Sequence, residues 1–100
     1  MKFLLTVTPR RVQQMPSAAL IDQNIAWIDA RLKDKTADCT YGFVTGGGIA
    51  IINADSHEAV TKLLTSYPGY PFVEMKVEAL CDIHAALEQV KIMAQRAAAV

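Results

Sequence analysis

The feature that most constrains the fold is a short segment in which apolar and charged side chains alternate at every position. Phe72 precedes it, and its members are Val73, Glu74, Met75, Lys76, Val77 and Glu78. Successive side chains of a strand point to opposite faces, so residues 72–78 are predicted to form a strand with one apolar and one charged face. The proline- and glycine-rich run that starts at Tyr67 predicts a turn before it.

Similar patterns predict the other strands. Residues 2–8 alternate well enough to form a first strand, which Pro9 ends. Segments 39–45 and 49–54 are rich in aromatic and β-branched residues and flank three consecutive glycines. This arrangement predicts a hairpin. A phosphate-binding loop is the weaker interpretation, because a strand rather than a helix follows the glycines.

Helical spacing predicts three helices. The first runs from about Pro16 to Lys35, and its buried seam consists of Ile21, Ile25, Ile28 and Leu32. A short second helix has two good caps and a capping-box pattern, formed by Asp55, Ser56 and Glu58. A last helix is capped by Asp82, and its predicted inner stripe consists of Ile83, Leu87, Val90, Ala94 and Ala97.

This order of elements predicts one α+β domain of the ferredoxin-like type over residues 1–100, with an added C-terminal helix. Parallel crossovers are right-handed in nearly all cases, so both crossover helices should cover the same face of the sheet. The other face is expected to carry apolar side chains without cover, namely Leu4, Val44, Ile52 and Phe72. Leaving such side chains wet costs about 1.5–3 kcal/mol each. We therefore expect an obligate homodimer.

Composition restricts the partners. Ten basic residues balance ten acidic ones, which disfavours nucleic acid as a partner. No apolar run approaches the length of a membrane span, and the N-terminal run is too short for a signal peptide, so we expect a cytoplasmic protein. Cys39 and Cys81 lack metal-ligand spacing and are expected to be reduced, buried thiols. No metal site is predicted, and His57 and His84 are expected at the surface.

The order of elements and several residues resemble the muconolactone isomerase family of the dimeric α+β barrel superfamily. The residues are Tyr70-Pro71-Phe72, Val77, Leu80-Cys81 and, more weakly, Arg31-Leu32. The resemblance covers nearly the full length as architecture. It implies a sheet-to-sheet dimer, sometimes assembled into larger rings, that acts on small lactones or organic acids without a cofactor.

Moving a proton from one carbon of a lactone to another needs a base and a group that stabilises enolate charge. Glu74 is the candidate base, because it lies on the strand face opposite Val73 and Met75. The alternative interpretation is an ion pair of Glu74 with Lys76 or with a partner residue at the interface. Tyr41 either donates to the enolate or is a half-buried strand residue.

A second stripe on the first helix contains Asn24, Trp27 and Arg31. Asn24 and Arg31 are suited to hold a carboxylate or lactone oxygen, with Trp27 and Phe72 as walls. The stripe is otherwise the border between core and solvent. The sequence leaves open whether a pocket lies inside the barrel or between helix and sheet.

The leading functional hypothesis is a cofactor-free proton-shift isomerase in aromatic catabolism. The alternatives are a non-catalytic ligand-binding or assembly protein and a cofactor-independent monooxygenase on the same scaffold.

Overall fold

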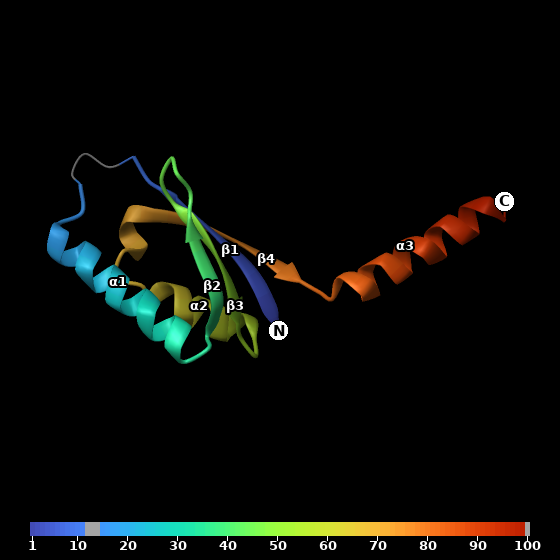
Figure 1. Cartoon of the computed structure of the whole chain (residues 1–100), viewed down its shortest axis with the longest axis horizontal. Coiled ribbons are helices and arrows are strands. Elements are labelled where there is room, and N and C mark those ends of the chain that lie inside the picture. Colours follow the sequence, from blue (N-terminus) through green and yellow to red (C-terminus); the bar gives the residue numbers. More distant parts are fainter. Residues whose placement is uncertain (12–14, 100) are drawn as a thin grey trace.

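One antiparallel sheet with strand order β2-β3-β1-β4 organises the chain (Figure 1). The computed structural model describes residues 1–11 and 15–99. The strands are β1 (Lys2–Pro9), β2 (Ala37–Gly42), β3 (Gly48–Asn53) and β4 (Val73–Leu80), and the helices are α1 (Ala18–Lys33), α2 (His57–Thr65) and α3 (Ile83–Ala98). A single 3₁₀ turn, η1 (Tyr70–Phe72), precedes β4. The predicted ferredoxin-like fold is confirmed.

The hydrophobic core lies between the sheet and the two crossover helices. Its buried members are Phe3, Leu5, Ala37, Ile52, Val60 and Leu64, and Leu32 of α1 packs against them. Phe3 pairs with Ile52, so these two side chains share the face that the helices cover, which we call the helix face. Because alternate residues point to opposite faces, Leu4, Ile49 and Ile51 lie on the other face, which we call the open face.

Three residues expected on the open face lie elsewhere, and only Leu4 of the four is placed correctly. Ile52 is buried at 3% exposure on the helix face, because its register places it opposite the buried Phe3 of β1. Phe72 belongs to η1, since the Tyr-Pro-Phe sequence closes a 3₁₀ turn before the strand begins. Val44 lies in the fully exposed hairpin loop.

Glycine fixes the hairpin between β2 and β3. Gly46 and Gly47 have φ values of 108° and 78°, a region that other residues rarely adopt. A β-carbon on Gly47 would also lie 2.2 Å from the carbonyl oxygen of Val7. The predicted hairpin is confirmed, although β2 ends at Gly42, three residues before its predicted end.

Side-chain caps set where the helices begin. Ser17 accepts a hydrogen bond from the Leu20 amide, so α1 begins at Ala18 rather than at Pro16. Ser56 caps α2 by accepting from the Ala59 amide, and the capping box predicted for Asp55 and Glu58 is therefore not formed. The predicted Asp82 cap of α3 is confirmed by its bond with the Ala85 amide.

The orientation of α1 differs from the prediction. Asn24 is the buried residue of this helix, while Ile21 and Ile25 of the predicted seam are exposed. Trp27 packs edge-on against Tyr67 with ring centroids 5.2 Å apart, which turns the Asn24–Trp27 side inward. Of the predicted seam, Ile28 and Leu32 are partly buried, and Leu32 packs against the core; Asn24 of the second stripe is more deeply buried than either.

The C-terminal helix projects away from the rest of the domain (Figure 1). The radius of gyration is 17.6 Å, whereas a compact chain of this length has about 13 Å. Its predicted inner stripe has no cover among the described residues: Ile83, Leu87 and Val90 are exposed. Periodicity identified the apolar side of α3 but wrongly assigned it to this chain's core.

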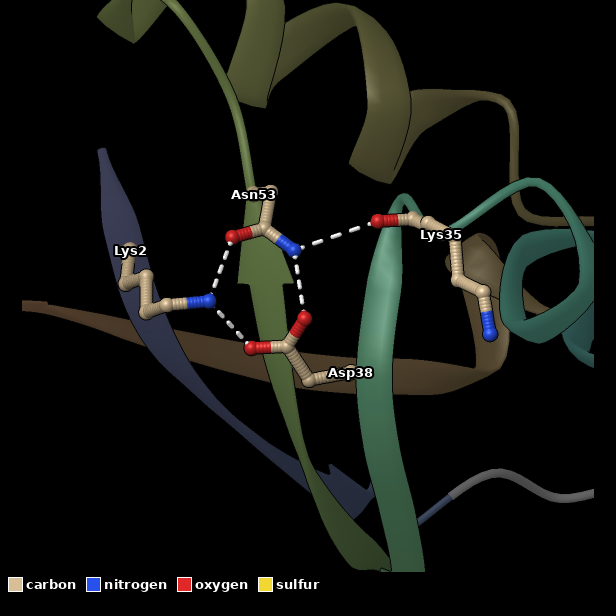
Figure 2. A network of polar contacts seen from close by, with 4 residues as sticks. All are labelled: Lys2, Lys35, Asp38 and Asn53. Atoms are coloured by element: carbon tan, nitrogen blue, oxygen red, sulfur yellow. Dashed lines mark hydrogen bonds and ion pairs between the residues drawn. The ribbon is translucent and has the colours of Figure 1, made fainter.

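A polar network ties the start of β1 to β2 and β3 on the open face (Figure 2). Lys2 Nζ donates to Asp38 and, over 2.9 Å, to Asn53 Oδ1. Asn53 Nδ2 donates to Asp38 Oδ1 over 2.7 Å and to the Lys35 carbonyl over 3.1 Å. Asp38 occupies an irregularity in the β2–β3 register. The hydrogen bond from Lys2, and then that from Asn53, lowers the pKa of Asp38 below its usual value.

Neither cysteine is paired. Cys39 is partly buried, and Cys81 is exposed rather than buried as expected, because it follows β4 where the chain leaves the domain. None of the helices in the described part of the chain is long and apolar enough to cross a membrane.

Candidate functional site

A cavity of about 600 Å³ lies between α1 and the helix face of the sheet. Its floor comes from Leu5, Val7 and Ala50, and its walls come from α1 and from the segment between Tyr67 and Val73. The space exists because β3 presents small residues there: Gly48 pairs with Val7, and Ala50 pairs with Leu5. Neither has a side chain long enough to reach α1. The volume is typical of pockets that hold one small organic molecule.

Asn24 is the buried polar side chain of this cavity. It is 8% exposed, and its Oδ1 has no hydrogen-bond partner among the described residues. A buried amide without a partner is costly and uncommon in folded proteins. Either end of the amide can face a ligand, so Asn24 is able to accept from a hydroxyl or donate to a carbonyl.

Gly69 holds Asn24 in place from the other side. A β-carbon on Gly69 would lie 2.7 Å from Asn24 Nδ2 and 2.8 Å from Tyr67 Cε2. Only glycine fits at this distance, so the Tyr67–Gly69 turn packs directly on α1. The turn thereby restricts the rotamers open to Asn24.

Trp27 and Tyr67 form an aromatic corner of the cavity. Trp27 Nε1 donates to Ser66 Oγ over 3.1 Å, and the Ser66 hydroxyl donates to the Leu63 carbonyl over 2.6 Å. Burial raises the pKa of the Tyr67 phenol above its usual value. Tyr67 therefore stays protonated at neutral pH, and its hydroxyl can donate a hydrogen bond.

Arg10 brings a positive charge to the cavity. It is the one charged side chain among the described residues that line the cavity. Its Nε donates to the Val73 carbonyl over 3.0 Å, and its backbone amide donates to the Phe72 carbonyl over 2.9 Å. These bonds anchor the residue beside β4 and leave the two terminal nitrogens of the guanidinium outside them.

Three of the predicted site residues line the cavity, together with Tyr41 at its rim. Asn24, Trp27 and Phe72 lie in its walls. Tyr41 borders it beside Gly42, but pairing with Ile49 places the Tyr41 side chain on the open face, where it is 69% exposed.

Arg31 and Glu74 do not line the cavity. The guanidinium carbon of Arg31 lies 5.5 Å from the centroid of the Trp27 ring. Its Nε lies 3.1 Å from Asp34 Oδ2. Glu74 pairs with Thr8 and lies on the open side of β4. It lines a neighbouring hollow of about 440 Å³ that shares Arg10, Val73 and Met75 with the cavity.

Sequence reasoning missed Arg10, Tyr67 and Gly69. The sequence Tyr67-Pro68-Gly69 predicts a turn, but nothing in its local pattern indicates that this turn contacts α1. Arg10 carries no local signal beyond its position after β1. Within residues 1–11 and 15–99, no three His, Cys, Asp or Glu side chains lie close enough to hold a metal ion.

The fold and cavity define a ferredoxin-like α+β domain with a ligand-sized pocket between its helices and its sheet. Solved structures share this fold, and two of them are described here. Muconolactone isomerase superimposes with a TM-score of 0.71 and 20% sequence identity, over 82% of this chain and 90% of that one. The 5-chloro-2-hydroxyhydroquinone dehydrochlorinase TftG of Burkholderia phenoliruptrix AC1100, in complex with 2,5-dihydroxybenzoquinone, superimposes with a TM-score of 0.60 and 18% identity, over 81% and 94%.

The resemblance to muconolactone isomerase is thus confirmed at the level of the fold. No protein-family model and no curated protein sequence matches the chain.

Proposed function

We propose that this chain binds a small cyclic organic acid or lactone in the cavity between α1 and the sheet. The observation that carries the proposal is Asn24 Oδ1, which is buried without a hydrogen-bond partner among the described residues, at the wall of a largely apolar cavity of about 600 Å³. A ligand with a ring oxygen, carbonyl or hydroxyl beside Asn24 would satisfy this amide, while the apolar floor takes the ring.

Charge favours an anionic ligand. Arg10 is the one cation among the described lining residues, and no carboxylate is among them. A guanidinium binds a carboxylate through two parallel hydrogen bonds, so Arg10 is suited to hold the acid group of a ligand at the exposed edge of the cavity. Neutral lactones and quinones would fit the apolar part of the cavity but would leave Arg10 without a partner.

For the reaction, we propose a cofactor-free proton shift of the muconolactone isomerase type, in aromatic catabolism. The fold shared with two enzymes, named for a lactone and for a hydroquinone, supports this choice. The Tyr67 phenol is a suitable donor to an enolate oxygen. Glu74 remains the proposed base and would reach a ligand past the edge strand, from the hollow that Arg10 also lines.

Non-catalytic ligand binding is the second candidate, and one observation favours it. No Asp, Glu or His is among the described residues that line the cavity, so a general base has to come from outside its walls. Under this candidate Asn24 and Arg10 still bind the ligand, but no turnover follows.

Calorimetric titration tests the binding site directly. The panel contains 2,5-dihydroxybenzoquinone, a lactone with a carboxylate side chain and the neutral methyl ester of that lactone. We expect the acid to bind about tenfold or more tightly than its ester, and Asn24→Leu to weaken binding about tenfold through the lost hydrogen bond. Gln23→Leu, the same change at an exposed position of α1, is the control. Equal affinity of both variants for every compound would refute the site.

We also propose that the protein assembles as a homodimer, or as a ring of such dimers, in which a second copy covers the open face. Leu4, Ile49 and Ile51 support this arrangement, because they are apolar and lie on the face that α1 and α2 leave uncovered. The sheet-to-sheet packing expected from the sequence would remove them from water.

A further inference from the structure

A small chamber adjoins the main cavity at its inner end, between α1, α2 and the helix face of the sheet. It has a volume of about 30 Å³, and each residue that lines it is buried or partly buried. Its lining includes Ala37, Ile52 and Leu63, which are not among the described residues of the main cavity. The residues that line both spaces are Leu5, Trp27, Ile28, Thr40 and Ala50. The chamber is therefore a side branch of the cavity rather than a separate hollow at the surface.

The pairing of the strands explains why the two spaces meet. Thr40, Ala50 and Leu5 pair across β2, β3 and β1, so their side chains form one row on the helix face. Ala37 and Ile52 pair in the next row, and both line the chamber. Ala50 thus lies at the junction, and its side chain of one carbon leaves the two spaces adjoining.

The chamber has an apolar surface, although two kinds of polar residue line it. The hydroxyl of Thr40 donates to the Ile49 carbonyl over 2.9 Å. The guanidinium of Arg31 lies over the Trp27 ring and beside Asp34, which leaves the aliphatic stem of Arg31 to line the chamber. A buried water needs several polar partners, and apolar cavities stay dry. The group that suits this chamber is therefore apolar, and a volume of about 30 Å³ admits one group of the size of a methyl.

Trp27 holds the helix side of the chamber in a fixed position. Its Nε1 donates to Ser66 Oγ over 3.1 Å, and its ring packs against Tyr67. Ser66 in turn donates to the carbonyl of Leu63, a residue that lines the chamber. Because close-packed side chains yield little, such a chamber distinguishes groups that differ by one carbon.

We propose that the chamber receives a single methyl group carried on the ring of the ligand, and that ring-methylated cyclic acids or lactones are the preferred ligand class. This role rests on the ligand site proposed above and specifies one substituent of that ligand. Arg10 follows the end of β1, whereas Leu5 lies in its middle, so the acid group and the methyl group occupy opposite ends of the cavity. The methyl is therefore expected on a ring carbon distant from the acid group. Ala37 and Ile52 are the specificity-determining residues.

Calorimetric titration of the wild type with the carboxylated lactone and with its ring-methylated isomers tests the chamber. One methylene in an apolar pocket changes discrimination by about tenfold or more. We therefore expect at least one methylated isomer to bind about tenfold more tightly than the parent lactone. Replacement of that methyl by an ethyl group should abolish the gain, because the second carbon has no room in the chamber.

Two variants change the size of the chamber in opposite directions. Ala37→Val fills it, and we expect the roughly tenfold preference for the methylated isomer to disappear. Ala79→Val is the control, since Ala79 is an exposed residue of β4 that is not among the described residues lining either space. Ile52→Val enlarges the chamber by one carbon and should raise the affinity for the ethyl compound about tenfold over wild type. Urea denaturation shows that each variant is folded, and Ile52→Val still tests the chamber if Ala37→Val is not.

Equal affinity of the wild type for the parent lactone and for every methylated isomer would overturn the role of the chamber while leaving the ligand site intact. A methyl preference that survives in Ala37→Val and an ethyl affinity that does not change in Ile52→Val would overturn it as well, because the methyl group would then lie elsewhere. Failure of the wild type to bind any lactone of the set would refute the proposed ligand, and the role of the chamber with it.

Discussion

Gly69 approaches Asn24 so closely that a β-carbon at position 69 would lie 2.7 Å from Asn24 Nδ2. This contact joins the turn after α2 to the buried side of α1, and it holds the amide that carries the proposed ligand site. Asn24, Tyr67 and Gly69 all line the cavity, so this close approach lies in its wall.

Gly69→Ala is expected to destabilise the fold by about 1–3 kcal/mol, the usual cost of overpacking a closely fitted site. Ligand affinity should fall as well, because Asn24 and Tyr67 must move. Gly42→Ala is the matched control, since the nearest atom to its added β-carbon would lie 3.7 Å away. Urea denaturation of both variants measures the difference in their free energies of unfolding. If Gly69→Ala and Gly42→Ala are equally stable, the Tyr67–Gly69 turn accommodates the added β-carbon without strain.

Glu74→Gln is expected to lower lactone turnover by about 10²–10⁴ if Glu74 is the base, since this is the usual contribution of a general base. The exchange is nearly isosteric and lies at an exposed position, so thermal unfolding should not change. Absorbance assays on the carboxylated lactone measure the rate. Wild-type turnover in this variant would leave Glu74 as an interface residue only.

Tyr67→Phe should remove one ionisation from the alkaline absorbance titration, with a midpoint above 10, because burial favours the neutral phenol. A phenol whose pKa is raised in the folded state contributes stability below its unfolded pKa of about 10 that is lost as the pH rises further. The variant should therefore lose less stability than wild type above that pH. A difference spectrum with a midpoint below 10 would contradict the burial of this hydroxyl.

Asp38→Asn should reduce the acid sensitivity of the fold. The pKa of Asp38 is lowered in the folded state, so its contribution to stability is present above the unfolded value of about 3.8 and is lost as the pH falls through the folded value. The wild type and the variant should thus differ most near neutral pH and converge towards about pH 2. Denaturation at several pH values measures this convergence.

Local signals predicted the fold well. The alternation in β4, the glycines of the hairpin and the Asp82 cap each act over a few residues, so they can be read without a structure. The orientation of α1 could not be read in this way. Its apolar spacing favoured Ile21 and Ile25, and only the distant contacts of Asn24 with Gly69 and of Trp27 with Tyr67 decide which side faces inward.

The candidate site was only partly predictable for a related reason. Asn24, Trp27 and Phe72, which the sequence predicts as binding residues, line the cavity between helix and sheet, but the cavity itself depends on the small residues Gly48 and Ala50. The absence of a side chain gives no periodic signal. The apolar stripe of α3 was visible, but periodicity cannot indicate whether a chain uses such a stripe for its own core or for a neighbour.

Only Cys81 and Asp82 connect the sheet to α3, and neither is among the described residues that line the cavity. A change in either residue would redirect the helix, and none of those lining residues would have to move. Descendants of this chain could therefore change the direction of α3 while keeping one inherited cavity, or reshape the cavity through Gly48 and Ala50 while keeping the direction of α3.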